Sequence, residues 1–154
     1  MTKKMVMSRL RPVLAVVLVV FASFFFSFGS FAAKTKAATY TPAQVQIIKK
    51  YEPRLAEYRG RMDELQSLIK KREWVNVGSF IHGPLGQLRQ DIGYLNRNLL
   101  PSAQPEARKV AKALFVDLEA IDKAAEVGNY SLAVQQYSQA LNDFDAYLKL
   151  VPQV

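Results

Sequence analysis

The sequence predicts an all-α protein: an antiparallel up-and-down four-helix bundle after an N-terminal signal segment. Three observations predict this fold. Apolar residues recur at spacings of three and four along four successive stretches, short segments with Pro or Gly separate the stretches, and no strand signal is present. The chain has 154 residues, a length that suits a single domain.

Residues 1–33 are expected to be a signal peptide, residues 34–40 a flexible tail, and residues 41–154 the bundle. Four basic residues and no acid precede the uncharged run 12–28, and small residues follow it at Ser30 and Ala32. This order is typical of a secretory signal. The uncharged run of 17 residues also just reaches the length of a membrane span, so an uncleaved anchor is the alternative.

The first helix is predicted from Thr41 to about residue 72. Thr41 is a good N-cap, with Pro42 at the first helical position and Gln44 closing a capping box. Pro53 lies inside the stretch and predicts a kink or a break, because it has no N–H and crowds the preceding turn. The apolar face consists of Ile48, Tyr51, Leu55, Tyr58, Met62, Leu65 and Ile69.

The second stretch carries the interruption Gly83-Pro84. We expect a short first helical segment, a kink, and then a regular helix to about Leu100. Its apolar positions are Ile81, Leu85, Leu88, Ile92, Leu95 and Leu99.

The third and fourth helices are predicted with their caps. Ser102 is the expected N-cap of the third, Gly128 its C-terminal cap, and Asn129 the N-cap of the fourth, which ends at Pro152. The apolar faces are Ala107, Val110, Leu114, Leu118, Ile121 and Ala125 in the third helix, then Ala133, Tyr137, Leu141, Phe144 and Leu148 in the fourth.

The composition excludes several function classes. Without cysteine there are no disulfides, thiolate metal sites, cysteine nucleophiles or lipoprotein acylation. Beyond residue 33 the chain carries 17 basic and 13 acidic residues, a net charge of +4. Residues 34–72 have a balance of +6 and residues 113–154 one of −4, which suits docking on a partner or ordinary solvated helix faces. There is no dense basic stripe with interleaved aromatics for binding nucleic acid.

The single histidine, His82, is open to two interpretations. It is a metal ligand or docking residue, or a structural residue whose ring hydrogen-bonds a carbonyl freed by Pro84. One histidine without a nearby acid or hydroxyl pair makes no catalytic triad. A haem site shared with Met62 is disfavoured, because Met62 falls in the apolar face of the first helix.

Acidic residues gather at two places, for which a solvated face is preferred over a weak divalent-cation site: Asp117, Glu119 and Asp122 in the third helix, and Asp143 with Asp145 in the fourth. Residues 128–141 also mimic half of a tetratricopeptide repeat. Such arrays need about three copies, and only one is present. An exported helical-bundle adaptor with an unknown protein partner is therefore the alternative function.

The segment FIHGPLGQLRQD (residues 80–91), preceded by Trp74-Val75, resembles the cyanobacterial form of the PsbQ family, the extrinsic Q subunit of photosystem II. The start Tyr40-Thr41-Pro42 and the run ALNDFD (residues 140–145) are also similar. The resemblance extends over essentially the whole chain after the signal segment and agrees with a four-helix bundle.

This resemblance implies a non-enzymatic subunit in the thylakoid lumen, peripheral to the membrane, that binds no cofactor or metal itself. It would support the retention of calcium and chloride by the oxygen-evolving complex. The implied partners are the inner antenna protein and the manganese-stabilising protein. Cyanobacterial relatives commonly carry a lipoprotein cysteine, which this chain lacks. The motif residues expected to dock or to shape the docking face are Trp74, His82, Gly83, Pro84, Gln87, Arg89 and Asp91.

Overall fold

The computed structural model describes residues 38–154, so the predicted signal segment 1–33 lies outside the described residues. No strand occurs in the described part of the chain. Its five helices are α2 (Pro42–Lys71), α3 (Trp74–His82), α4 (Leu88–Asn98), α5 (Gln104–Glu126) and α6 (Tyr130–Leu150).

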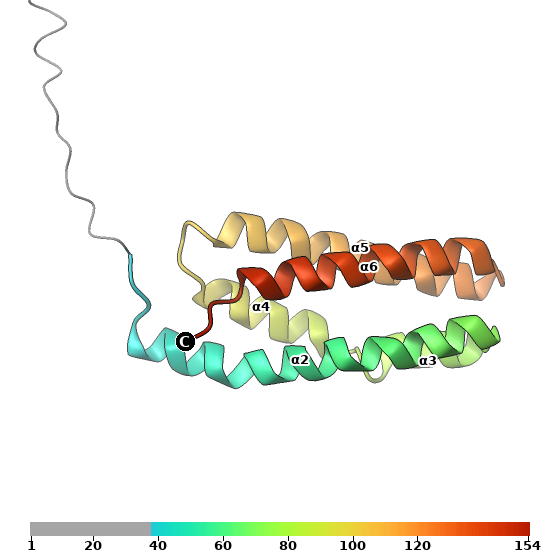
Figure 1. Ribbon diagram of the computed structural model, residues 1–154, viewed down its shortest axis with the longest axis horizontal. Helices are drawn as coiled ribbons and strands as arrows, with labels where there is room; N and C mark the ends of the chain where they lie inside the picture. Colours follow the sequence, from blue (N-terminus) through green and yellow to red (C-terminus); the bar gives the residue numbers. More distant parts are fainter. Residues whose placement is uncertain (1–37) are drawn as a thin grey trace, which may run out of the picture. The chain divides into compact units, whose positions relative to one another are not determined.

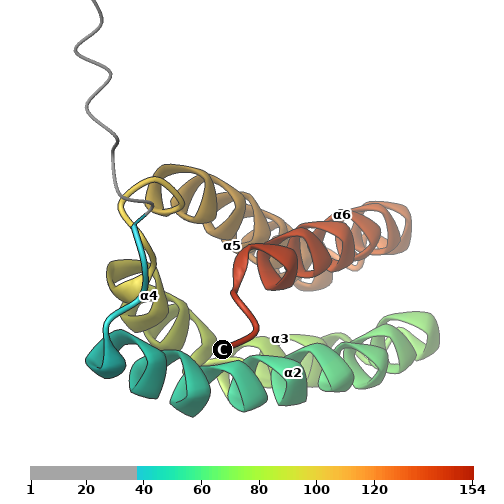
Figure 2. The same cartoon turned by 60° about the vertical axis from the view of Figure 1, so that its left-hand side comes forward.

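These helices form the predicted four-helix bundle, because α3 and α4 together make its second rod (Figure 1). α2 packs against α3, α4 and α6, and α5 packs against the same three helices. α2 and α5 therefore lie at opposite corners of the bundle, which the turned view also shows (Figure 2). None of the helices in residues 38–154 is long and apolar enough to cross a membrane.

α2 begins as predicted and continues through Pro53. The backbone N–H of Gln44 donates to Thr41 Oγ1 (3.3 Å) and the N–H of Thr41 donates to Gln44 Oε1 (2.9 Å), which completes the capping box. The break considered at Pro53 does not occur, since α2 has no interruption there. Pro53 is exposed, while Tyr51 and Leu55 on either side are buried. Packing of these neighbours holds the helical path across the missing hydrogen bond.

The second rod is interrupted at residues 83–87, where a kink was predicted. Pro84 has no N–H to donate to the carbonyl of Phe80, and the N–H of Leu85 donates to it instead (3.2 Å). The N–H of Gly86 donates to the carbonyl of Gly83 (2.9 Å). Leu85 is buried, and its contact with the core fixes this turn in place.

The prediction of Ser102 as N-cap is wrong. α5 begins at Gln104 after Ala103, and no side chain caps its first turn. The side-chain amide of Gln104 reaches back instead and donates to the carbonyl of Leu99 (2.9 Å). This bond ties the start of α5 to the end of α4.

The predicted turn between α5 and α6 is confirmed. Gly128 has φ 65°, and its N–H donates to the carbonyl of Ala125 (3.1 Å) while the N–H of Asn129 donates to that of Ala124 (2.8 Å). This pair of bonds is a Schellman motif. The side chain of Asn129 then caps α6 by accepting a hydrogen bond from the N–H of Leu132 (3.1 Å).

The four predicted apolar faces meet in one core. Every predicted position of α2 is buried, and burial of each large side chain contributes about 1.5–3 kcal/mol. A polar link crosses this core: the Tyr147 hydroxyl donates to Asn96 Oδ1 (2.8 Å) and so joins α6 to α4. Tyr40, at the end of the predicted tail, packs against the core beside the N–H of Leu100.

Candidate docking surface

The seven motif residues fall in three places. His82, Gly83, Pro84, Gln87 and Arg89 lie around the interruption of the second rod, beside α5. The two other motif residues, Trp74 and Asp91, lie apart from this group. Trp74 is at the opposite end of α3, about 12 Å from His82 along the helix axis. Asp91 is buried inside the bundle.

His82 contacts an acid that sequence reasoning did not place near it. Its Nε2 lies 2.9 Å from Asp122 Oδ2 on α5. The expectation that the ring bonds a carbonyl freed by Pro84 is therefore wrong, since Leu85 satisfies that carbonyl. The imidazole side chain is 72% exposed, so a partner can reach it.

Arg89 forms a second link from the motif to α5. Its guanidinium donates to Glu119 Oε1 (2.7 Å) and lies 4.2 Å from the ring centroid of Phe115. The side chains of Arg89 and Glu119 are 62% and 60% exposed. An exposed pair of this kind adds only about 0–1 kcal/mol to stability. The guanidinium is held in place on the ring and still faces solvent. Gln87, before α4, is also exposed and makes no capping bond.

The glycines of the motif fix the backbone of the turn. A Cβ on Gly83 would lie 2.8 Å from the carbonyl oxygen of Ser79. A Cβ on Gly86 would lie 2.4 Å from the carbonyl oxygen of His82. Both distances are shorter than van der Waals contact. The turn therefore positions His82 and Arg89 on either side of it.

Asp91 acts inside the bundle. It is 3% exposed, lies 2.9 Å from the guanidinium of Arg54, and accepts a hydrogen bond from the Tyr58 hydroxyl (3.0 Å). Burial raises the pKa of Tyr58, which keeps its proton on this bond. Asp91 thus joins α4 to α2 inside the bundle and does not itself face a partner.

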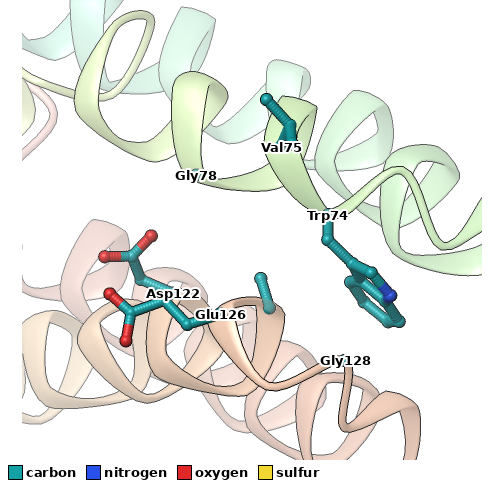
Figure 3. Close-up of a pocket in the computed structure, with 7 residues that line it drawn as sticks. Trp74, Val75, Gly78, Asp122, Glu126 and Gly128 are labelled. Atoms are coloured by element: carbon teal, nitrogen blue, oxygen red, sulfur yellow. The ribbon is translucent and has the colours of Figure 1, made fainter.

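Trp74 packs at the end of the bundle against the turn between α5 and α6. Its indole Nε1 lies 3.4 Å from the position of a Cβ on Gly128, so this glycine serves both the turn and the contact. A cleft of about 370 Å³ opens beside the indole, between α3 and α5 (Figure 3). Its lining residues are Trp74, Val75, Gly78, Asp122, Ala125, Glu126 and Gly128.

The acids of α5 and α6 are only partly a solvated face. Asp117 is 9% exposed, and burial, with Asp143 beside it, raises the pKa of Asp117 to about 6. Asp122 binds His82. Solvation was therefore the wrong interpretation for these two. Phe115, Glu119, Asp122 and Glu126 are spaced by four, three and four along α5, a pattern that marks one helix face and could have identified the partners of His82 and Arg89.

The exposed side chains of the motif are suited to contact with the surface of another protein. No group of three or more His, Cys, Asp or Glu side chains in residues 38–154 could hold a metal ion. Met62 is fully buried in the core of α2, as its spacing predicted. What the motif presents to solvent is an imidazole, a guanidinium held on an aromatic ring, and a polar amide beside a rigid turn.

Comparison with known proteins gives the family. Residues 28–152 match PsbQ, described as oxygen evolving enhancer protein 3. The match includes residues 128–141, so the segment that mimics a tetratricopeptide repeat is part of this fold. CyanoQ of Synechocystis sp. is 41% identical over 148 residues, which are 96% of this chain and 99% of the relative. The chain therefore belongs to the PsbQ family, as a cyanobacterial-type extrinsic Q subunit of photosystem II.

Proposed function

We propose that this protein is a non-enzymatic subunit on the lumenal face of the thylakoid membrane, where it stabilises the oxygen-evolving complex and supports its retention of calcium and chloride. The observation that carries the proposal is family membership over nearly the whole chain. The exposure of His82, Gln87 and Arg89 supports it, because exposed side chains can contact another protein.

The inner antenna protein and the manganese-stabilising protein are the proposed partners. His82, Gln87 and Arg89 would contact them directly, while Gly83 and Pro84 would hold the turn in shape. Asp91 would stabilise the bundle by joining α4 to α2. Arg89 is well suited to such a role, since a guanidinium can bind a carboxylate and stack on an aromatic ring at the same time. Its present partners, Glu119 and Phe115, keep it extended along α5.

Rebinding to photosystem II tests the docking role. Photosystem II is purified gently from the source cells, the protein is removed by a high-salt wash, and purified variants are added back. We expect Arg89→Glu and His82→Ala to rebind more weakly than wild type, Arg89→Glu by about tenfold or more. Lys149→Glu is the control, since Lys149 is exposed on α6, which carries none of the motif residues. Unchanged rebinding of both motif variants would remove the assignment of these residues.

Oxygen evolution tests the physiological role. Depleted photosystem II should lose activity faster than the reconstituted complex when calcium and chloride are lowered, and wild-type protein should restore the tolerance. Absence of the protein from gently purified photosystem II would contradict the proposal at its first step. Equal activity with and without the protein at low calcium and chloride would contradict the retention role alone.

A further inference from the structure

The cleft beside Trp74 lies outside the group of motif residues around the turn at residues 83–87. It is bounded on one side by α3 and on the other by the last turns of α5 (Figure 3). Trp74 and Gly78 are four residues apart on α3, and Asp122 and Glu126 are four apart on α5, so each pair shares a helix face.

One wall of the cleft is acidic. Asp122 uses Oδ2 for His82, while its Oδ1 lies on the side of α3, 3.2 Å from the position of a Cβ on Gly78. Within residues 38–154, Oδ1 has no hydrogen-bond donor, and Glu126 has neither a hydrogen bond nor an ion pair. Each carboxylate can accept several hydrogen bonds, so this wall has unused acceptor capacity.

The opposite wall is aromatic. The Trp74 indole is partly buried, which holds the ring in one place. Val75 also lines the cleft, but it is 83% exposed and its side chain points away from α5 (Figure 3). Gly78 and Ala125 have almost no side chain, which leaves space between the walls.

We propose that this cleft binds an arginine side chain of a protein partner. Charge complementarity selects this occupant. Carboxylates repel an anion, whereas a planar guanidinium can donate to Asp122 and Glu126 and lie against the indole. In a PsbQ-family protein we take the partner to be a photosystem II subunit, and in that respect the inference rests on the proposed function.

Trp74 is the only tryptophan in the chain, so its fluorescence reports on the cleft directly. The full chain is titrated with the peptide acetyl-Leu-Arg-Leu-amide and with the same peptide carrying citrulline, a neutral isostere of arginine. We expect a saturable change with the arginine peptide and binding about tenfold weaker with citrulline. No saturable change, or equal binding of the two peptides, would overturn the cleft as an arginine site.

Two kinds of variant assign the binding to the cleft. Asp122→Asn combined with Glu126→Gln should lower the affinity for the arginine peptide to that for the citrulline peptide. Glu57→Gln combined with Asp63→Asn, at two exposed acids of α2, removes the same two negative charges and controls for net charge. Gly78→Ala narrows the cleft without changing charge, and we expect it to weaken binding several-fold. Gly60→Ala is its control, because a Cβ there meets nothing within 4 Å. Helicity by circular dichroism verifies that each variant is folded.

Rebinding to depleted photosystem II identifies the source of the arginine. We expect the double variant to rebind more weakly than wild type, and Glu126→Gln alone, which keeps the contact between His82 and Asp122, to do so as well. Glu57→Gln, with the same single loss of negative charge, should rebind normally. If wild type itself fails to rebind, the proposed function fails, while the peptide titration still decides the cleft. If the arginine peptide binds but the double variant rebinds like wild type, the assignment of the arginine to a photosystem II subunit is overturned.

Discussion

Arg89 and Asp91 lie two positions apart in the motif and have different roles. Arg89 faces solvent along α5, whereas Asp91 is buried against Arg54 and Tyr58 of α2. We predict that Asp91→Asn lowers the free energy of unfolding by about 1–3 kcal/mol, because Arg54 and Tyr58 lose a charged partner. Rebinding of the folded protein to photosystem II should be unchanged.

Arg89→Glu should show the opposite pattern, with weaker rebinding and a stability change within about 1 kcal/mol. Urea unfolding and rebinding, measured on both variants, separate the two roles. A loss of affinity in folded Asp91→Asn would contradict this division. The different roles of Arg89 and Asp91 could not be predicted from the sequence. Asp91 is buried against Arg54, which is far away in the chain and meets Asp91 only because α2 packs on α4.

Asp117 gives a prediction about pH. The pKa of Asp117 is raised to about 6 by burial and by Asp143, from an ordinary value of 3.8. The folded state therefore binds this proton more tightly than the unfolded state, and stability contributed by Asp117 falls as pH rises from about 4 to about 6. The full effect is about 2–3 kcal/mol.

Asp117→Asn removes the ionising group and can still donate to Asp143. We expect its urea midpoint to be higher than that of wild type at pH 7 and to depend less on pH between 4 and 7. The contrasting variant is Asp145→Asn. Arg59 holds the pKa of Asp145 below its ordinary value, so this variant should lose stability at neutral pH. An Asp117→Asn protein with the pH dependence of wild type would contradict the assignment.

At the scale of single helices, the sequence predicted what is decided locally. The capping box at Thr41, the turn at Gly128 and the cap at Asn129 depend on residues within one turn of each other, and all three are confirmed. The structural effects of Pro53 and Ser102 depend instead on contacts with other parts of the bundle. Packing on either side of Pro53 keeps α2 continuous, and the bond from Gln104 to Leu99 starts α5 without Ser102.

The interruption between α3 and α4 gives a prediction about a glycine. A Cβ on Gly86 would lie 2.4 Å from the carbonyl oxygen of His82 and 3.1 Å from that of Gly83, so the turn must open to accept it. We expect Gly86→Ala to lower the free energy of unfolding by about 2 kcal/mol or more. Displacement of His82 and Arg89 should weaken rebinding to photosystem II as well.

Gly93→Ala is the matched control for that substitution. Gly93 lies within α4, and a Cβ there meets nothing within 4 Å. The change should leave stability unaltered or raise it by up to about 1 kcal/mol, because alanine favours a helix. Similar destabilisation by the two substitutions would show that the turn does not require glycine at Gly86.

At the scale of the whole molecule, charge is distributed unevenly, with a basic excess near the start of the bundle and acids in the last turns of α5. The basic excess of residues 34–72 includes exposed cations of α2, while Asp122 and Glu126 are acids of α5, and these two helices do not pack against each other. The sequence showed this asymmetry but not the cleft, which exists only because α3 and α5 lie side by side. Such a molecule can join an acidic surface to a basic one.

This arrangement predicts how salt affects docking. Lys49 and Lys50 are exposed on α2, and we expect Lys49→Glu combined with Lys50→Glu to slow association with depleted photosystem II about tenfold at low ionic strength. The difference from wild type should shrink as salt rises, because the Debye length falls to about 8 Å at 0.15 M. Lys109→Glu with Lys149→Glu, on α5 and α6, is the control and should associate like wild type. If both pairs slow association equally, net charge guides docking, and the position of the basic residues on α2 does not.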